Sequence, residues 1–193
     1  MKKNLFLHIP KTAGSSLLSS EVGNKIDYRI HSFIGCISEQ INKLNAQDSF
    51  KFCITRNPWD RFFSLYQYFY NMREDHMFYK YNPSIIKVVR RYDTFEKFCC
   101  AFPELEIKNF HFYPQSKYIF LDDLIIPDYI GKIETISEDI NELAEMMNVK
   151  LTREFPHSNK SNQLNYRTQY NQKTKNMIAE VYKMDVERLG YDF

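Results

Sequence analysis

The sequence predicts a three-layer α/β/α fold built on a central, mainly parallel sheet. Short apolar runs, which are typical of buried parallel strands, alternate with segments whose apolar residues recur at helical spacing. This alternation extends over 193 residues without an internal repeat, a low-complexity tract or a linker. We therefore expect a single α/β domain over residues 1–193, long enough to bury a sizeable core.

The first half of the chain gives the clearest elements. Its predicted elements are, in order, the strand 3–9, the helix 15–22, the strand 27–30, the helix 37–44 and the strand 50–55. A further helix begins at Pro58, because Asn57 is a favourable N-cap and proline suits the first helical position. The aromatic residues of this helix are expected to face the core; they are Trp59, Phe62, Phe63, Tyr66 and Tyr70.

The second half is less regular. Residues 73–83 are polar and aromatic without a clear period, which indicates a lid or a binding loop. The further predicted elements are the helices 84–91 and 94–101, the strands 117–121 and 129–133, the helix 139–148, the polar loop 155–165 and the helix 172–189.

Composition excludes several classes of protein. A formal net charge of +2 provides no general field for binding nucleic acid. The four cysteines form no C-x-x-C pair and no metal-like spacing with histidine, so we expect reduced thiols and no metal site. The apolar start is too short for a signal peptide, and no stretch approaches the roughly 20 apolar residues of a transmembrane helix. These features predict a cytoplasmic protein.

The segment HIPKTAGSSL, which begins at His8, is the first candidate site. A buried strand followed by a tight loop and a helix presents backbone N–H groups that favour an anion, and phosphate suits them best. Gly14 allows close approach of the backbone, Lys11 supplies a positive charge, and one threonine and two serines add hydroxyl donors. The P-loop formula fails because Lys11 precedes the glycine, and the dinucleotide formula fails because the loop has one glycine.

A second candidate phosphate site follows the third predicted strand. Arg56 stands at the carboxyl end of that strand, where open α/β sheets bind ligands. Ser64 lies two turns into the next helix, on a flank of its aromatic stripe. Together with the first loop, an arginine and a serine in these places indicate a nucleotide that carries phosphates at two distant positions.

These two segments resemble the cofactor segments of sulfotransferases that use 3′-phosphoadenosine 5′-phosphosulfate (PAPS). IPKTAGSS resembles the 5′-phosphosulfate loop of that family, and TRNPWDRFFSLYQYF resembles its 3′-phosphate segment. Later segments resemble, in the same order, the carbohydrate sulfotransferases of the Golgi, including the heparan sulfate 2-O- and chondroitin types, and their bacterial relatives; these segments are YPQSKYIF, IGKIETISEDINELAEMMN, PHSNKSNQLNYRTQY and VYKMDVERLGYDF. The resemblance covers nearly the whole chain and is weakest over residues 73–108.

The resemblance implies a P-loop-NTPase-like sulfotransferase fold. It also implies in-line transfer of a sulfuryl group from PAPS to an acceptor hydroxyl, which leaves 3′-phosphoadenosine 5′-phosphate (PAP) and requires no metal. Lys11 would stabilise the leaving 5′-phosphate. The residues that would hold this phosphate are Thr12, Ala13, Gly14, Ser15 and Ser16.

The remaining site residues also come from the resemblance. Arg56 and Ser64 would hold the 3′-phosphate, and Lys160 and Ser161 match a late loop that closes over the nucleotide in relatives. His31 stands near the place of the catalytic histidine in related enzymes and would be the base. Glu39 is a second candidate for the base, since some sulfotransferases use a carboxylate.

The acceptor is expected to be a carbohydrate or a glycan precursor, and residues 73–108 would form part of its site. His8 is expected to be structural, and His111 could reach an acceptor. The chain is shorter than the Golgi enzymes and shows no membrane anchor, which suggests a minimal catalytic domain that acts inside the cell.

Two alternatives remain open. One is an ATP-dependent kinase, in which Asp122 and Asp123 of the segment YIFLDD would hold magnesium at the end of a strand. The other is a module that binds a nucleotide or a sugar without catalysis.

Overall fold

The computed structural model describes residues 2–31, 37–81, 83–105, 107, 109–122, 124–156 and 164–193. The chain forms two compact units, each made of two stretches of sequence. The first unit contains Met1–Arg56 and Pro114–Ser161, and the second contains Asn57–Tyr113 and Asn162–Phe193. The single domain expected from the sequence stays a prediction.

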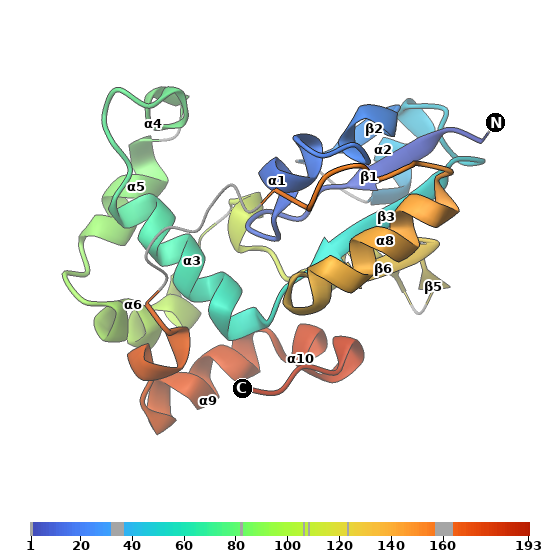
Figure 1. The fold of residues 1–193 in the computed structure, drawn as a ribbon. Helices are drawn as coiled ribbons and strands as arrows, with labels where there is room; N and C mark the ends of the chain where they lie inside the picture. The colour runs from blue at the N-terminus through green and yellow to red at the C-terminus, as the bar shows by residue number, and fades with distance from the viewer. Residues whose placement is uncertain are drawn as a thin grey trace. The chain divides into compact units, whose positions relative to one another are not determined.

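The first unit is built on a four-stranded parallel sheet (Figure 1). Its strands are β1 (Asn4–Leu7), β2 (Tyr28–Ile30), β3 (Phe50–Thr55) and β6 (Tyr129–Lys132), arranged in the order β2-β1-β3-β6. In the strand register Leu7 pairs with Ile30, and Phe6 pairs with Phe52. Because every pairing is parallel, all four strands end at the same edge of the sheet.

Helices flank both faces of this sheet, which confirms the predicted α/β/α fold. On one face α1 (Gly14–Leu18) and α8 (Ile136–Met146) share an apolar cluster with Phe6, Phe52 and Ile54. Alternate strand residues point to the other face, which α2 (Ile37–Lys43) flanks (Figure 1). The first unit therefore has the layers that the alternation of strands and helices predicts.

The segment 117–121 is not the strand that its apolar run predicts. Ser116–Ile119 forms a short helix (α7), and only Phe120–Leu121 (β4) is extended, paired antiparallel with Leu124–Ile125 (β5) in a separate hairpin. One helical turn is enough to bury Tyr118 and Ile119, so this apolar run needs no place in the sheet.

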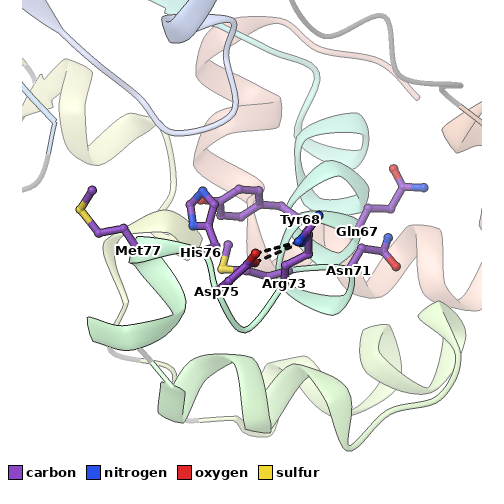
Figure 2. A pocket seen from close by; sticks show the side chains of 8 residues that line it. Gln67, Tyr68, Asn71, Arg73, Asp75, His76 and Met77 are labelled. Atoms are coloured by element: carbon purple, nitrogen blue, oxygen red, sulfur yellow. Dashed lines mark hydrogen bonds and ion pairs between the residues drawn. The ribbon is translucent and has the colours of Figure 1, made fainter.

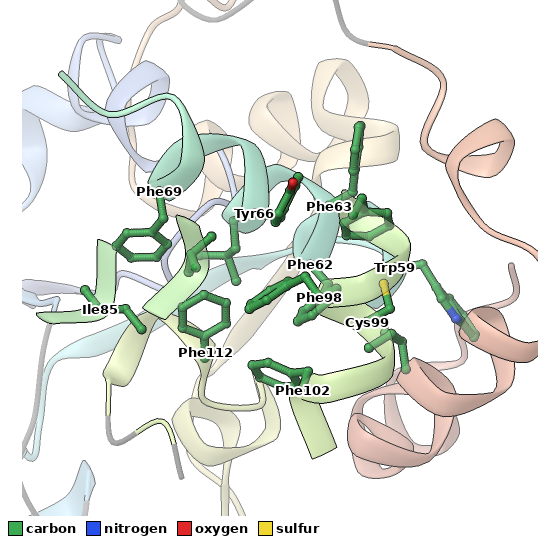
Figure 3. Packing of buried hydrophobic residues seen from close by; sticks show 14 of the residues in the cluster. Trp59, Phe62, Phe63, Tyr66, Phe69, Ile85, Phe98, Cys99, Phe102 and Phe112 are labelled. Carbon is green, nitrogen blue, oxygen red and sulfur yellow. The ribbon is translucent and has the colours of Figure 1, made fainter. Parts of the chain in front are cut away.

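The second unit is helical and has its own aromatic core. Helix α3 (Pro58–Tyr70) packs against α5 (Pro83–Arg90) and α9 (Gln172–Val181), and α6 (Phe95–Ala101) also packs against α9. The other helices are α4 (Met77–Tyr81), α10 (Lys183–Leu189) and the short 3-10 turns Phe102–Glu104, Phe110–Phe112 and Tyr166–Gln169. Figure 3 shows the rings that gather around α3, where the Phe62 centroid lies 4.7 Å from Phe102 and 5.4 Å from Phe98.

The start of α3 follows the sequence prediction closely. The Asn57 side chain accepts hydrogen bonds from the backbone N–H groups of Trp59 and Asp60, at 3.1 and 3.4 Å. The predicted aromatic stripe is buried except for Tyr70, which is partly exposed. The indole N–H of Trp59 donates to the carbonyl of Lys175 at 2.9 Å, which attaches α3 to α9.

Two predictions for the second unit are wrong. Residues 73–83, expected to be a loop, contain the helix α4. The expected helix 172–189 is divided at Tyr182, whose backbone leaves helical geometry (φ −107°, ψ 29°). The Tyr182 side chain is buried and its hydroxyl donates to the Phe112 carbonyl at 3.1 Å, a long-range contact that helical periodicity does not encode. Within the described ranges, no helix has both the length and the apolar character needed to cross a bilayer.

Candidate functional site

Three neighbouring strands of the first unit end side by side, and each is followed by a residue of the predicted site. Strand β1 lies between β2 and β3, so the Lys11–Ser16 loop is flanked by His31 after β2 and by Arg56 after β3. The chain passes from β1 to β2 on one side, and then returns to β3 on the other. The gap between β1 and β3 is therefore the topological switch point, where open α/β sheets bind ligands.

The loop after β1 is tightly folded. Lys11 and Ala13 have left-handed backbone conformations, with φ of 69° and 62°, whereas Thr12 between them does not. Left-handed residues next to right-handed ones direct backbone N–H groups into a common concavity, a known arrangement for binding anions. The hydroxyl of Thr12 is buried and donates to the carbonyl of Ile9 at 2.9 Å. The Thr12 hydroxyl therefore stabilises the loop.

Gly14 is required by close packing within this loop. A Cβ atom at Gly14 would lie 1.8 Å from His8 Nε2 and 2.3 Å from His8 Cδ2, far inside contact distance. His8 is itself buried, so its ring has little room to move away. The two serines that follow differ in exposure, since Ser15 is exposed and Ser16 is buried.

Arg56 is bonded to the Lys11–Ser16 loop. Its guanidinium Nη1 donates to the carbonyl of Lys11 at 3.1 Å, across the gap between β3 and β1. Its backbone is held by the buried side chain of Gln115, whose Oε1 accepts from the Arg56 N–H at 2.9 Å and whose Nε2 donates to the Arg56 carbonyl at 2.8 Å. Arg56 is only 5% exposed, so both its backbone and its guanidinium are fixed by contacts.

The electrostatics around the Lys11 and Arg56 side chains favour a bound anion. Burial, and then the positive charge of Arg56, lower the pKa of Lys11 from 10.5 to about 8. Two cationic side chains that lie close together repel each other. A bound phosphate or sulfate would offset this repulsion, because each cation attracts its negative charge. The Lys11–Arg56 pair is therefore suited to a strongly anionic ligand.

His31 lies in a partly buried position beside His8. Their ring centroids are 4.2 Å apart at an interplanar angle of 37°. Burial, and then the positive charge of Arg29, lower the pKa of His31 below its ordinary value, although a hydrogen bond with the His8 backbone offsets part of this effect. A lowered pKa keeps the imidazole neutral near pH 7, which is the form that accepts a proton.

The roles of the other predicted site residues stay predictions. Ser64 lies on α3 in the second unit, where it is partly exposed, and its pairing with Arg56 stays a prediction. Lys160 and Ser161 fall outside the described residues. Glu39 is exposed in the first turn of α2. Among the residues that the structure describes, no three His, Cys, Asp or Glu side chains group as metal ligands would.

Gln115 is the site residue that sequence reasoning missed. Nothing local marks it, because it stands between a proline and a short helix and contacts Arg56 across 59 positions of sequence. His8 was expected to be structural, yet its ring contacts both the glycine of the loop and His31.

The second unit contains an open pocket of about 780 Å³ at the end of α3 (Figure 2). Gln67 lies on the last turn of α3 and Asn71 directly follows that helix; Tyr68, between them in sequence, is half-buried. The rim carries an exposed ion pair in which Arg73 Nη2 lies 2.7 Å from Asp75 Oδ2. The remaining lining residues are Met72, His76 and Met77. Neutral amides, an aromatic ring and a paired charge provide many hydrogen-bonding groups without a net charge.

Comparison with known proteins identifies the family. The sequence model of the family described as "Sulfotransferase family" matches residues 2–192, which is nearly the whole chain. No curated protein and no solved structure matches. The match includes the β1 loop, the strand end that bears Arg56 and the helix α3. The chain therefore belongs to the sulfotransferase family.

Proposed function

We propose that this protein transfers a sulfuryl group from PAPS to a hydroxyl of a saccharide acceptor. The observation that supports this proposal most directly is the pair of cationic side chains at the switch point, where Lys11 follows β1 and Arg56 follows β3. Membership of the sulfotransferase family gives the reaction class. The donor and the acceptor class are inferred from the resemblance of the chain's segments to those of the carbohydrate sulfotransferases.

The loop and Arg56 suit the two anionic ends of PAPS. The left-handed residues Lys11 and Ala13 shape a loop whose backbone N–H groups bind the 5′-phosphosulfate, and Gly14 keeps that loop compact. Arg56, whose backbone is hydrogen-bonded to the Gln115 side chain, binds the 3′-phosphate together with Ser64. The resemblance adds Lys160 and Ser161 as residues that contact the nucleotide. When bound, PAPS supplies a sulfuryl group on a good leaving phosphate.

The chain itself supplies a base and a fixed positive charge. His31, neutral because burial lowers its pKa, accepts the proton of the acceptor hydroxyl as the new S–O bond forms. Lys11 stabilises the negative charge that develops on the leaving phosphate oxygen as the old S–O bond breaks. General bases contribute about 10²–10⁴-fold to such rates, and fixed charges act by similar factors. Neither role requires a metal ion.

We place the saccharide acceptor in the α3 pocket. The amides of Gln67 and Asn71 can each donate to and accept from sugar hydroxyls, and Tyr68 offers an apolar ring face. A pocket of about 780 Å³ accommodates one or two sugar rings. Burial raises the pKa of Tyr68, so its hydroxyl stays a neutral donor.

Calorimetric titration of PAP, 5′-AMP and ATP, with and without magnesium, tests the donor. PAP should bind without metal and at least tenfold more tightly than 5′-AMP, because only PAP carries a 3′-phosphate. Arg56→Ala should remove that preference. The control Arg91→Ala, which removes an exposed arginine between α5 and α6, should not. Equal affinity for 5′-AMP, or a preference for magnesium–ATP, would contradict PAPS as donor.

Initial rates with a panel of saccharides test the acceptor. Gln67→Leu or Asn71→Leu should raise the acceptor KM about 3–10-fold, the effect of one lost hydrogen bond, and leave PAP affinity unchanged. Gln172→Leu, on the exposed start of α9, is the matched control. An unchanged KM in both pocket variants would exclude this pocket as the acceptor site.

The structure weakens the kinase alternative. Asp122, expected at the end of a sheet strand, lies in the exposed turn between β4 and β5 with a φ of 54°, outside the parallel sheet. Asp123 lies outside the described residues. A module that binds without catalysis would show PAP binding with no transfer to any acceptor in the panel.

A further inference from the structure

The imidazole of His8 occupies a central place at the carboxyl edge of the sheet. His8 directly follows β1 and is 8% exposed, and its N–H donates to the Ile30 carbonyl at 2.8 Å, which extends the β1–β2 pairing. One face of its ring stacks on Phe6, with centroids 5.0 Å apart and planes 15° apart. The His8 side chain is thus fixed from the backbone and from the core.

The same ring contacts two parts of the proposed site. The His31 ring lies 4.2 Å away, which is a direct packing contact. The edge of the His8 ring fills the space where any residue other than glycine at position 14 would place its Cβ, since all three nearest atoms belong to this imidazole, at 1.8 to 2.5 Å. His8 therefore contacts both the β1 loop and His31, and its ring links their positions.

We propose that His8 is a positioning residue for sulfuryl transfer, which fixes the His31 base relative to the 5′-phosphosulfate loop by packing against both His31 and Gly14. This inference rests on the proposed function, because it gives His31 and the loop their roles. The physical basis is close packing: a fixed ring in contact with two neighbours transmits a displacement of either neighbour to the other. A misplacement of about 1 Å can cost on the order of 100-fold in rate.

A pair of double-mutant cycles tests the proposal. His8→Ala should lower kcat about 10–100-fold, because His31 loses its support. In a His31→Ala background, the same change should lower kcat no further, since the group that His8 positions is gone. Gly14→Ala alone should weaken PAP binding, and His8→Ala/Gly14→Ala should restore part of it, because the clashing ring has been removed.

His8→Asn provides a milder variant in case His8→Ala does not fold. Its planar amide keeps part of the contact, so its kcat should lie between those of the wild type and His8→Ala. Phe50→Ala is the matched control for the loss of a ring: Phe50 stacks on Phe52 at 6.1 Å near the opposite end of β3, and its loss should lower stability without changing kcat.

NMR titration of His31 gives a readout that needs no substrate. His8 and Arg29 are the titratable groups that face His31 among the described residues, and Arg29 is kept in every variant. Removal of the His8 ring admits water to His31, so the pKa of His31 should rise toward its ordinary value in His8→Ala.

The outcomes separate this inference from the proposed function. If the wild type transfers sulfuryl groups but the His8 and His31 effects are additive and the pKa of His31 is unchanged, His8 is only a core residue and the inference is overturned. If the wild type neither binds PAP nor transfers a sulfuryl group, the proposed function fails, and the positioning role fails with it.

Discussion

Gln115→Met gives the most direct test of how the site is held together. The wild-type side chain is fully buried and makes two hydrogen bonds to the backbone of Arg56, at 2.9 and 2.8 Å. Methionine has nearly the same length and fills the same space, but it makes neither bond. The N–H and carbonyl of Arg56 would then stay buried without these partners.

The size of the effect follows from those two bonds. Each buried group that loses its partner costs about 1–3 kcal/mol, so the free energy of unfolding should fall by roughly 3 kcal/mol. For a chain of this length about 1 kcal/mol lowers Tm by about 2–4 °C, which gives a fall of about 6–12 °C. Because Arg56 also loses its fixed position, PAP affinity should fall about tenfold although the guanidinium is still present.

Urea unfolding and calorimetric titration with PAP measure the two effects. Gln47→Met is the control, since it makes the same chemical change at an exposed position whose side chain donates only to Asn42. A Gln115→Met protein as stable as the control would refute the account of the buried bonds. A protein that is destabilised but binds PAP normally would show that Gln115 supports the fold and not the guanidinium.

Four further results are expected. PAP affinity should fall as the pH rises through about 8, because phosphate binds the protonated form of Lys11, whose pKa is about 8; Lys11→Arg, charged at every pH used, should remove that dependence in calorimetric titrations. Phe62→Ala should reduce the free energy of unfolding by about 3–5 kcal/mol in urea, and a loss under 1 kcal/mol would contradict its central place in the aromatic core. Arg90→Met should lower Tm by a few degrees, because the Arg90 side chain donates to the carbonyls of Tyr70 and Met72 at the end of α3. The two units should unfold in one calorimetric transition, since each is made of two separate stretches of chain; two resolved transitions would replace the single domain by two.

Local signals in the sequence determined much of the fold. The Asn57–Pro58 pair specified the start of α3, because a side chain that caps its own helix acts over two or three residues. The apolar runs gave β1, β2, β3 and β6, and parallel pairing followed from the helices between them. The composition of the β1 loop indicated an anion site. The resemblance of this loop and of the Arg56 segment to sulfotransferases indicated the reaction class.

Other features depended on contacts between residues far apart in sequence. The run 117–121 is equally compatible with a strand and with a helical turn, and only its packing in the folded chain decides between them. The division of the last helix at Tyr182 depends on a bond to Phe112, 70 positions away. No periodicity of 2 or 3.6 residues can encode such contacts.

The sequence by itself indicated Lys11 and Arg56 as candidates for the chemistry, because residue type and position after a strand are local properties, and the resemblance to a family added His31 as a candidate. Only the tertiary structure decided how they are held. The strand order places β1 between β2 and β3, Gln115 fixes Arg56 across 59 positions, and His8 contacts both Gly14 and His31. Strand order and close packing are properties of the assembled core, where each side chain takes the space that distant neighbours leave.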